Sequence, residues 1–273
     1  MMSDVSHRLV SLVRRADADL AEAALLCAAG CDADVDIGVQ LLRIDALADQ
    51  LQGSGHDLTT GAAAALSLGE HLGGELGFHG DPDRFHDPES SLLHRVLDTR
   101  QGLPITLSIV YVALARRCKV SAWPIALPGH VVVGVADGDR PQVLDPYHAG
   151  QLLSEPELER RVRGATGGRL AYRRAMLRPT PAVAIVRRLL NNLTRDLLAA
   201  ERPATALWTV DVKLALPNHV PDDHRQRGEL ASTTGRFDVA AAAFERYLEL
   251  TSGDTQERHR ARRAAIEARA RMN

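Results

Sequence analysis

Apolar and polar positions along the chain predict a helical first part, a short β-rich middle and a helical end. The run LAEAALLCAAG, residues 20–30, crowds apolar side chains onto one face of a helix and ends at a glycine that is suited to stop it. The next run, DADVDIGVQLLRIDALADQLQ, predicts a second helix with Asp34 or Asp36 as its N-cap. Val39 and Leu42 are among its apolar positions at helical spacing.

A third helix is predicted at residues 60–76, and the loop GFHGDPDRFHDPESS follows it. After the short helical run LLHRVLDTR, the segment ITLSIVYVALARRC is almost wholly apolar, so we expect a helix that is buried on most sides. Three β-type runs come next: SAWPIAL, HVVVGVA and QVLDPY. Helices followed by sequential strands predict an α+β fold in which a small antiparallel sheet packs on one central helix.

The sequence PTP at residues 179–181 predicts a domain boundary, because the chain after it reads as helical throughout. We expect a first domain at 1–178, with a helical region (1–100) and a core (101–178), and an all-α domain at 179–273. A 34-residue period relates two parts of the second domain, and it is typical of tetratricopeptide repeats, although a generic helical hairpin would also fit. The repeated positions are Ala206, Val210, Leu214 and Leu216, matched by Ala240, Phe244, Leu248 and Leu250.

Composition narrows the class of protein. With 33 basic and 35 acidic side chains the net charge is −2, so no global field favours nucleic acid or a membrane surface. No apolar run is long enough for a spanning helix, and the charged N-terminus does not resemble a signal peptide. Three cysteines are too few for a disulfide framework. We therefore expect a cytoplasmic protein.

A histidine and an aspartate stand where a thiol protease or acyl-transferase would carry them. Such an enzyme uses a cysteine at a helix start, a histidine on one strand and an acid on the next, because the acid holds the imidazole in one tautomer. His130 begins one predicted strand and Asp145 ends the next. Their separation of fifteen positions leaves room for a strand, a turn and a return strand, which would bring the two side chains together.

The residues from Leu20 to Val162 resemble the bacterial SirB-type family of transglutaminase-like proteins, and the C-terminal part is similar to the tetratricopeptide region that usually accompanies it. The segments that carry the resemblance include ELGFHGDPDRFHDPESSLLHRVLDTRQGLPITLSIVYVALARR, ALPGHVVV and VLDPYHAG. The resemblance implies the transglutaminase-like (papain-like) fold. It also assigns His130 and Asp145 to the histidine and aspartate of that core. Members of this family mostly lack an established activity.

The same resemblance places Pro104 at the position of the nucleophilic cysteine, so that cysteine is absent. A proline suits the first position of a helix, where its missing N–H is not needed. Ser108, one turn further on, could in principle supply a hydroxyl, but a bond to a backbone carbonyl explains it better. Cys118 lies at the opposite end of the same predicted helix, about 21 Å away at 1.5 Å per residue.

Other polar groups carry weaker hypotheses. In the resemblance, Arg95 and Arg100 border the helix start, and with Ser108 and Gly129 they are the candidate binding residues of a vestigial cleft. We predict no metal site and no cofactor, since the Cys27 and Cys31 pair and the polar loop at 77–91 lack standard ligand spacing. The arginines of RHRARRAAIEARARMN lack interleaved aromatic residues, so we expect no nucleic-acid partner.

Two functions remain open at this point. One is a non-catalytic transglutaminase-like protein whose helical repeats bind a protein or peptide partner. The alternative is an enzyme that acts on amide or peptide bonds, as a hydrolase or acyl transferase, through His130 and Asp145 with water or a hydroxyl. In a third hypothesis the vestigial cleft beside His130 binds a small molecule or the end of a peptide.

Overall fold

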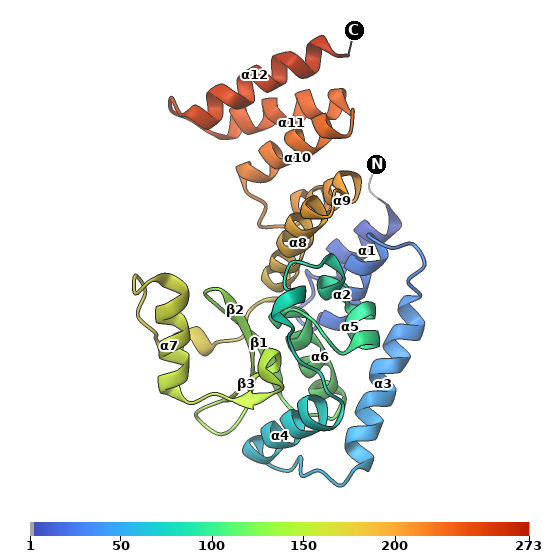
Figure 1. Cartoon of the computed structure of the whole chain (residues 1–273), viewed down its shortest axis with the longest axis vertical. Coiled ribbons are helices and arrows are strands. Elements are labelled where there is room, and N and C mark those ends of the chain that lie inside the picture. Colours follow the sequence, from blue (N-terminus) through green and yellow to red (C-terminus); the bar gives the residue numbers. More distant parts are fainter. Residues whose placement is uncertain (1–2, 273) are drawn as a thin grey trace.

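The computed structural model describes residues 3–272 of the chain; Met1, Met2 and Asn273, which open and close the two expected domains, lie outside them. The fold is α+β, as predicted: within the described residues, helices surround one four-stranded antiparallel sheet in the order β1-β2-β3-β4 (Figure 1). The first helices are α1 (Asp4–Leu12), α2 (Leu20–Ala29), α3 (Ile37–Gly53), α4 (Gly61–Leu68), α5 (Leu93–Thr99) and α6 (Pro104–Arg117). The strands are β1 (Ala122–Leu127), β2 (His130–Val135), β3 (Gln142–Asp145) and β4 (Gln151–Leu152). The later helices are α7 (Glu155–Thr166), α8 (Ala182–Ala199), α9 (Pro203–Ala215), α10 (Pro221–Thr233), α11 (Phe237–Leu250) and α12 (Gln256–Ala270).

The second predicted helix is α3, and Asp36 caps it by accepting a hydrogen bond from the Val39 amide (3.0 Å). The face of α3 that packs against the protein is not the one that the apolar spacing at Val39 and Leu42 predicts. Ile44, Ala48 and Leu51 are buried, whereas Val39 and Leu42 are exposed. The helix carries apolar side chains on more than one face, and tertiary packing selects which face is covered.

The third predicted helix changes type partway along. After α4 the chain continues as a π-helix, η1 (Gly69–Glu75). Two glycines of η1 lie against the backbone that follows β3, and a Cβ at Gly73 would fall 1.9 Å from the Ala149 carbonyl oxygen. The missing side chains therefore allow η1 to touch the loop that follows Asp145. π-helical turns are rare in proteins, and those that occur are frequently found at functional sites.

α6 forms the centre of the fold, as its apolar sequence predicts. Every side chain from Pro104 to Ala115 is buried. On β2, Val131, Val133 and Val135 belong to the core that includes α6, whereas Val132 belongs to a second cluster under α7. The sheet therefore lies between α6 and α7 (Figure 1). The sequence did not predict α7 or the short strand β4.

The first two helices of the C-terminal part share the core of the N-terminal part. α8 packs against α2 and against the 3₁₀ turn η3 (Pro88–Ser91). On α9, the Trp208 indole lies over Gly30 and donates to Ser6 Oγ (3.1 Å). α10, α11 and α12 extend away from this body at the far end of the molecule (Figure 1). Gly228 of α10 packs on the Phe244 ring of α11, where a Cβ would approach to 2.7 Å.

Within residues 3–272 every helix is too short or too polar to cross a bilayer.

Candidate functional site

The structure joins His130 and Asp145 by a hydrogen bond. Pro128 and Gly129 form the two-residue turn between β1 and β2, and Gly129 has the positive φ of +68° that such a turn requires. This turn places His130 at the first position of β2. Its Nε2 lies 2.9 Å from Oδ1 of Asp145, the last residue of β3. Nε2 donates to the carboxylate, which leaves Nδ1 as the free nitrogen of the ring.

Asp145 is fully buried and holds several donors at once. His148 Nδ1 lies 2.8 Å and Arg161 Nη2 lies 2.7 Å from its Oδ2, and the Tyr147 amide donates to Oδ1 (3.1 Å). Burial opposes ionisation of this carboxyl, but the hydrogen bond from His130 and the nearby positive groups outweigh it, so the pKa of Asp145 lies below its ordinary value. Asp145 is therefore a buried anion that orients both histidines.

The helix that would present a nucleophile begins at Pro104. This residue occupies the first turn of α6, and no side chain caps the helix there. The nearest hydroxyls along the helix are engaged with backbone: Ser108 Oγ donates to the Val131 carbonyl (3.3 Å), and Thr106 Oγ1 donates to the Ser90 carbonyl (2.8 Å). The bond of Ser108 also shows that the first turns of α6 lie beside the start of β2.

The three thiols lie elsewhere. Cys27 and Cys31 are buried at α2, and burial raises the pKa of both, to about 12 for Cys31. Cys118 follows α6, and its Sγ lies 3.6 Å from the Ala48 carbonyl; burial raises its pKa as well. A raised pKa keeps each thiol protonated and weakly nucleophilic at neutral pH.

Arg95 and Arg100, predicted to border the cleft, make their contacts away from the His130–Asp145 pair. Arg95 lies 3.7 Å from Asp32, and Arg100 donates to the Leu76 carbonyl at the end of η1. Arg100 ends α5 in the left-handed region, with φ of +62°. Their assignment to a binding site stays a prediction.

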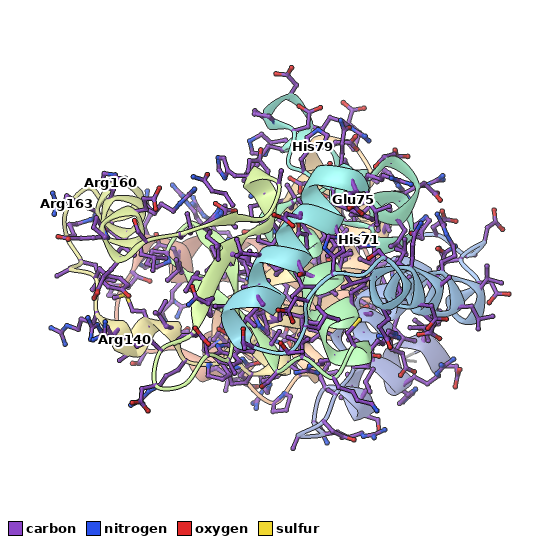
Figure 2. All side chains as sticks on the ribbon, turned by 90° about the horizontal axis from the view of Figure 1, so that it is seen from below. His71, Glu75, His79, Arg140, Arg160 and Arg163 are labelled. Atoms are coloured by element: carbon purple, nitrogen blue, oxygen red, sulfur yellow. The ribbon has the colours of Figure 1, made fainter. Side chains whose placement is uncertain are left out.

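Two groups of side chains have the composition of a cation site. His130, Asp145 and His148 form one, but the Arg161 guanidinium beside the carboxylate opposes a cation there. The other joins His56 to His71 and Glu75 of η1, and Figure 2 labels the last two on neighbouring turns. Glu75 accepts from His56 (3.2 Å) and from His71 (2.7 Å). These hydrogen bonds tie the loop before α4 to η1.

Sequence reasoning missed three residues of the site. The rings of Tyr147 and His148 lie near the His130 ring, with their centroids 6.1 Å and 6.3 Å, respectively, from the His130 centroid. Both belong to the run DPYHAG, so their closeness to Asp145 in sequence was an available signal. Arg161 reaches Asp145 from α7, and nothing in the sequence pattern pairs the two.

The class of protein follows from this fold and from a comparison of the sequence with known families. The sequence profile of the transglutaminase-like superfamily matches residues 40–191, which include α6, the sheet and the His130–Asp145 pair. The chain belongs to this superfamily.

Similar proteins carry the name UPF0162. The UPF0162 protein of Xylella fastidiosa strain 9a5c is 29% identical over 234 residues, which cover 85% of this chain and 83% of that protein. UPF0162 protein PA3419 of Pseudomonas aeruginosa is 29% identical over 217 residues, or 80% of this chain and 79% of the relative. A UPF0162 protein of Vibrio cholerae is 25% identical over 181 residues, with 66% and 67% covered.

Proposed function

We propose that this protein is a non-catalytic member of the transglutaminase-like superfamily, of the SirB type, that binds a protein or peptide partner through its C-terminal helices. In this proposal the protein acts in the cytoplasm, without a nucleic-acid or membrane partner and without a cofactor. Three free thiols suit a reducing compartment.

The observation that carries the proposal is the start of α6. The base and its orienting acid are assembled at His130 and Asp145, while the helix beside them begins with Pro104. A proline offers no attacking atom, and the neighbouring hydroxyls of Thr106 and Ser108 are bonded to carbonyls. Amide cleavage or transfer through a covalent intermediate needs such an atom. The retained pair then serves to hold the start of β2, the end of β3 and the loop at Tyr147 in place.

The C-terminal helices supply the partner surface in this proposal. We assign α8 to α11 to two tetratricopeptide-like units and α12 to a capping helix. The close contact of Gly228 with the Phe244 ring is the small-against-large packing that such paired helices use. A hollow of about 290 Å³ lies between α10 and α12, lined by Phe237, Phe244 and Glu267 among others. It offers an apolar floor with a charged rim for a peptide segment.

The alternative function is an enzyme that acts on amide or peptide bonds. The free Nδ1 of His130 and the buried anion of Asp145 favour it, because together they form a base that could activate water. Under this alternative, His130→Ala abolishes turnover of an amide substrate. Under the proposal, the same variant leaves partner binding intact.

A capture experiment with matched variants tests the proposal. The intact protein is expected to retain a specific set of partners from the native cell. Glu267→Arg, which reverses a charge on the rim of the hollow, is expected to lose them. Glu249→Arg lies on α11 outside the hollow and serves as the matched control, with unchanged capture expected.

Retention by Glu267→Arg together with loss in His130→Ala would contradict the proposal. That pattern would place recognition at the His130 site and would favour the alternative.

A further inference from the structure

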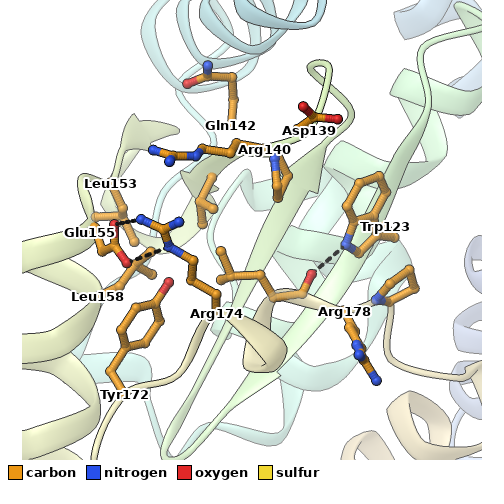
Figure 3. Close-up of a pocket in the computed structure, with 14 residues that line it drawn as sticks. Trp123, Asp139, Arg140, Gln142, Leu153, Glu155, Leu158, Tyr172, Arg174 and Arg178 are labelled. Carbon is orange, nitrogen blue, oxygen red and sulfur yellow. Dashed lines mark hydrogen bonds and ion pairs between the residues drawn. The ribbon is translucent and has the colours of Figure 1, made fainter.

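A second cavity lies on the sheet at some distance from His130. It has a volume of about 470 Å³ and opens between β1, the β2–β3 turn, α7 and the segment before α8 (Figure 3). Register separates it from the His130 site: Leu127 pairs with His130, whereas Trp123 of the cavity pairs with Gly134. Four residues along a strand span about 13 Å at 3.3 Å per residue. His130 therefore lies outside the cavity, whereas Val143 of the cavity wall is two residues before Asp145 on β3.

The inner wall of the cavity is apolar. Val143, Leu153 and Leu158 are nearly fully buried and belong to the small hydrophobic cluster between the sheet and α7. Trp123 and Tyr172 add aromatic surface, and both are partly exposed. A volume of this size lies within the roughly 300–1,000 Å³ of small-molecule sites.

The walls are fixed in place by hydrogen bonds. Trp123 Nε1 donates to the Leu177 carbonyl (3.0 Å), a bond that Figure 3 shows. Thr180 ties the same segment to β1, since its amide donates to the Pro124 carbonyl (3.0 Å) and its Oγ1 accepts from Ala126 (2.9 Å). Arg174 forms two bonds with Glu155, at 2.9 and 2.8 Å. A ligand would therefore meet a preformed site, with little ordering cost.

The rim of the cavity carries excess positive charge. Arg174 is neutralised by Glu155, but within residues 3–272 the guanidinium groups of Arg140 and Arg178 make no hydrogen bond or ion pair. Asp139 is the other acid on the rim. The surroundings are basic too, because residues 157–178 contain seven arginines and two glutamates. Figure 2 shows Arg140, Arg160 and Arg163 on the same side of the molecule, around α7.

We propose that this cavity binds a small organic anion that has an aromatic or aliphatic body. The body would lie against Leu153 and Leu158 between the two aromatic side chains. The anionic group would face Arg140, whose planar guanidinium group suits a carboxylate or phosphate and which Figure 3 draws on the side of Arg174, across the cavity from Arg178. The site is independent of the proposed partner surface on α10 to α12.

Titration with 4-phenylbutyrate by isothermal calorimetry, on the full chain at low salt, tests this site. Binding is expected, and the neutral 4-phenylbutanamide is expected to bind at least fivefold more weakly. Arg140→Gln is expected to weaken binding of the carboxylate by at least fivefold. Arg262→Gln, at an exposed arginine of α12 far from the cavity, is the matched control and should leave affinity unchanged.

Fluorescence gives a second measurement that locates the ligand. The chain has two tryptophans, so Trp208→Phe leaves Trp123 as the reporter. Its emission should change on addition of 4-phenylbutyrate. Absence of binding, equal affinity for the acid and the amide, or full affinity in Arg140→Gln would overturn the assignment.

Discussion

A chain that ends at residue 178 is expected not to fold, whereas a chain that ends at residue 219 is expected to keep a cooperative thermal transition. The reason is α8. Its side chains Ile185, Leu189 and Leu193 are fully buried in the main core, among several others of that helix. Each such side chain contributes about 1.5–3 kcal/mol on burial, so the loss of the whole face is comparable to the roughly 5–15 kcal/mol stability of a typical domain.

The contact of α9 with the N-terminal helices strengthens this expectation. The Trp208 indole fills the space above Gly30 and bonds to Ser6, so a chain without α9 also exposes α1 and α2. Circular dichroism with thermal unfolding measures both chains. A cooperative transition in the chain that ends at 178 would support the predicted boundary at PTP and contradict the shared core.

Asp145→Ala is expected to lower the free energy of unfolding by about 3 kcal/mol at pH 7. The substitution removes a buried anion and leaves His130, His148 and Arg161 without their common partner. Loss of one partner from a buried ion pair costs about 3–5 kcal/mol, and the partial exposure of these cations favours the lower end. Asp83→Ala, at an exposed carboxyl, is the control and should change stability by less than about 0.5 kcal/mol.

The effect of Asp145 also depends on pH. Folding depresses the pKa of this carboxyl below its ordinary value of 3.8, so its stabilisation is fully present above pH 3.8 and is lost as pH falls through the lower, native-state value. The difference between the wild type and Asp145→Ala should therefore shrink in strong acid. Chemical denaturation at a series of pH values measures it. A difference that grows below pH 3.8 would contradict the ionised state of Asp145.

The sequence predicted the parts of the fold that depend on local pattern. The apolar run after Pro104 predicted a buried helix, the three β-type runs predicted β1 to β3, and Asp36 is one of the two caps predicted for α3. It did not predict α7, since its buried side chains are just Leu158 and Val162 and their spacing alone is a weak signal. The π-helix η1 depends on a tertiary contact between glycines and a distant loop, which a local pattern does not contain.

The candidate site also contains residues that the sequence predicts and residues that only the packed structure brings together. His130 and Asp145 could be paired from their strands and from the length of chain between them. Arg161 comes from α7, and the second cavity depends on the segment before α8 folding back on β1 through Thr180. Such contacts are set by the packed structure, not by spacing in the sequence.

The central claim is that Pro104 occupies the place of a nucleophile beside His130. The variant Pro104→Cys tests it most directly, by the rate of alkylation with iodoacetamide at pH 6 to 8 followed by mass spectrometry. The account predicts that the new thiol reacts faster than Cys27, Cys31 and Cys118, because the helix start and His130 favour its thiolate, and that adding His130→Ala removes this advantage. A thiol at residue 104 that reacts no faster than the three natural cysteines, or whose rate is indifferent to His130, would contradict it.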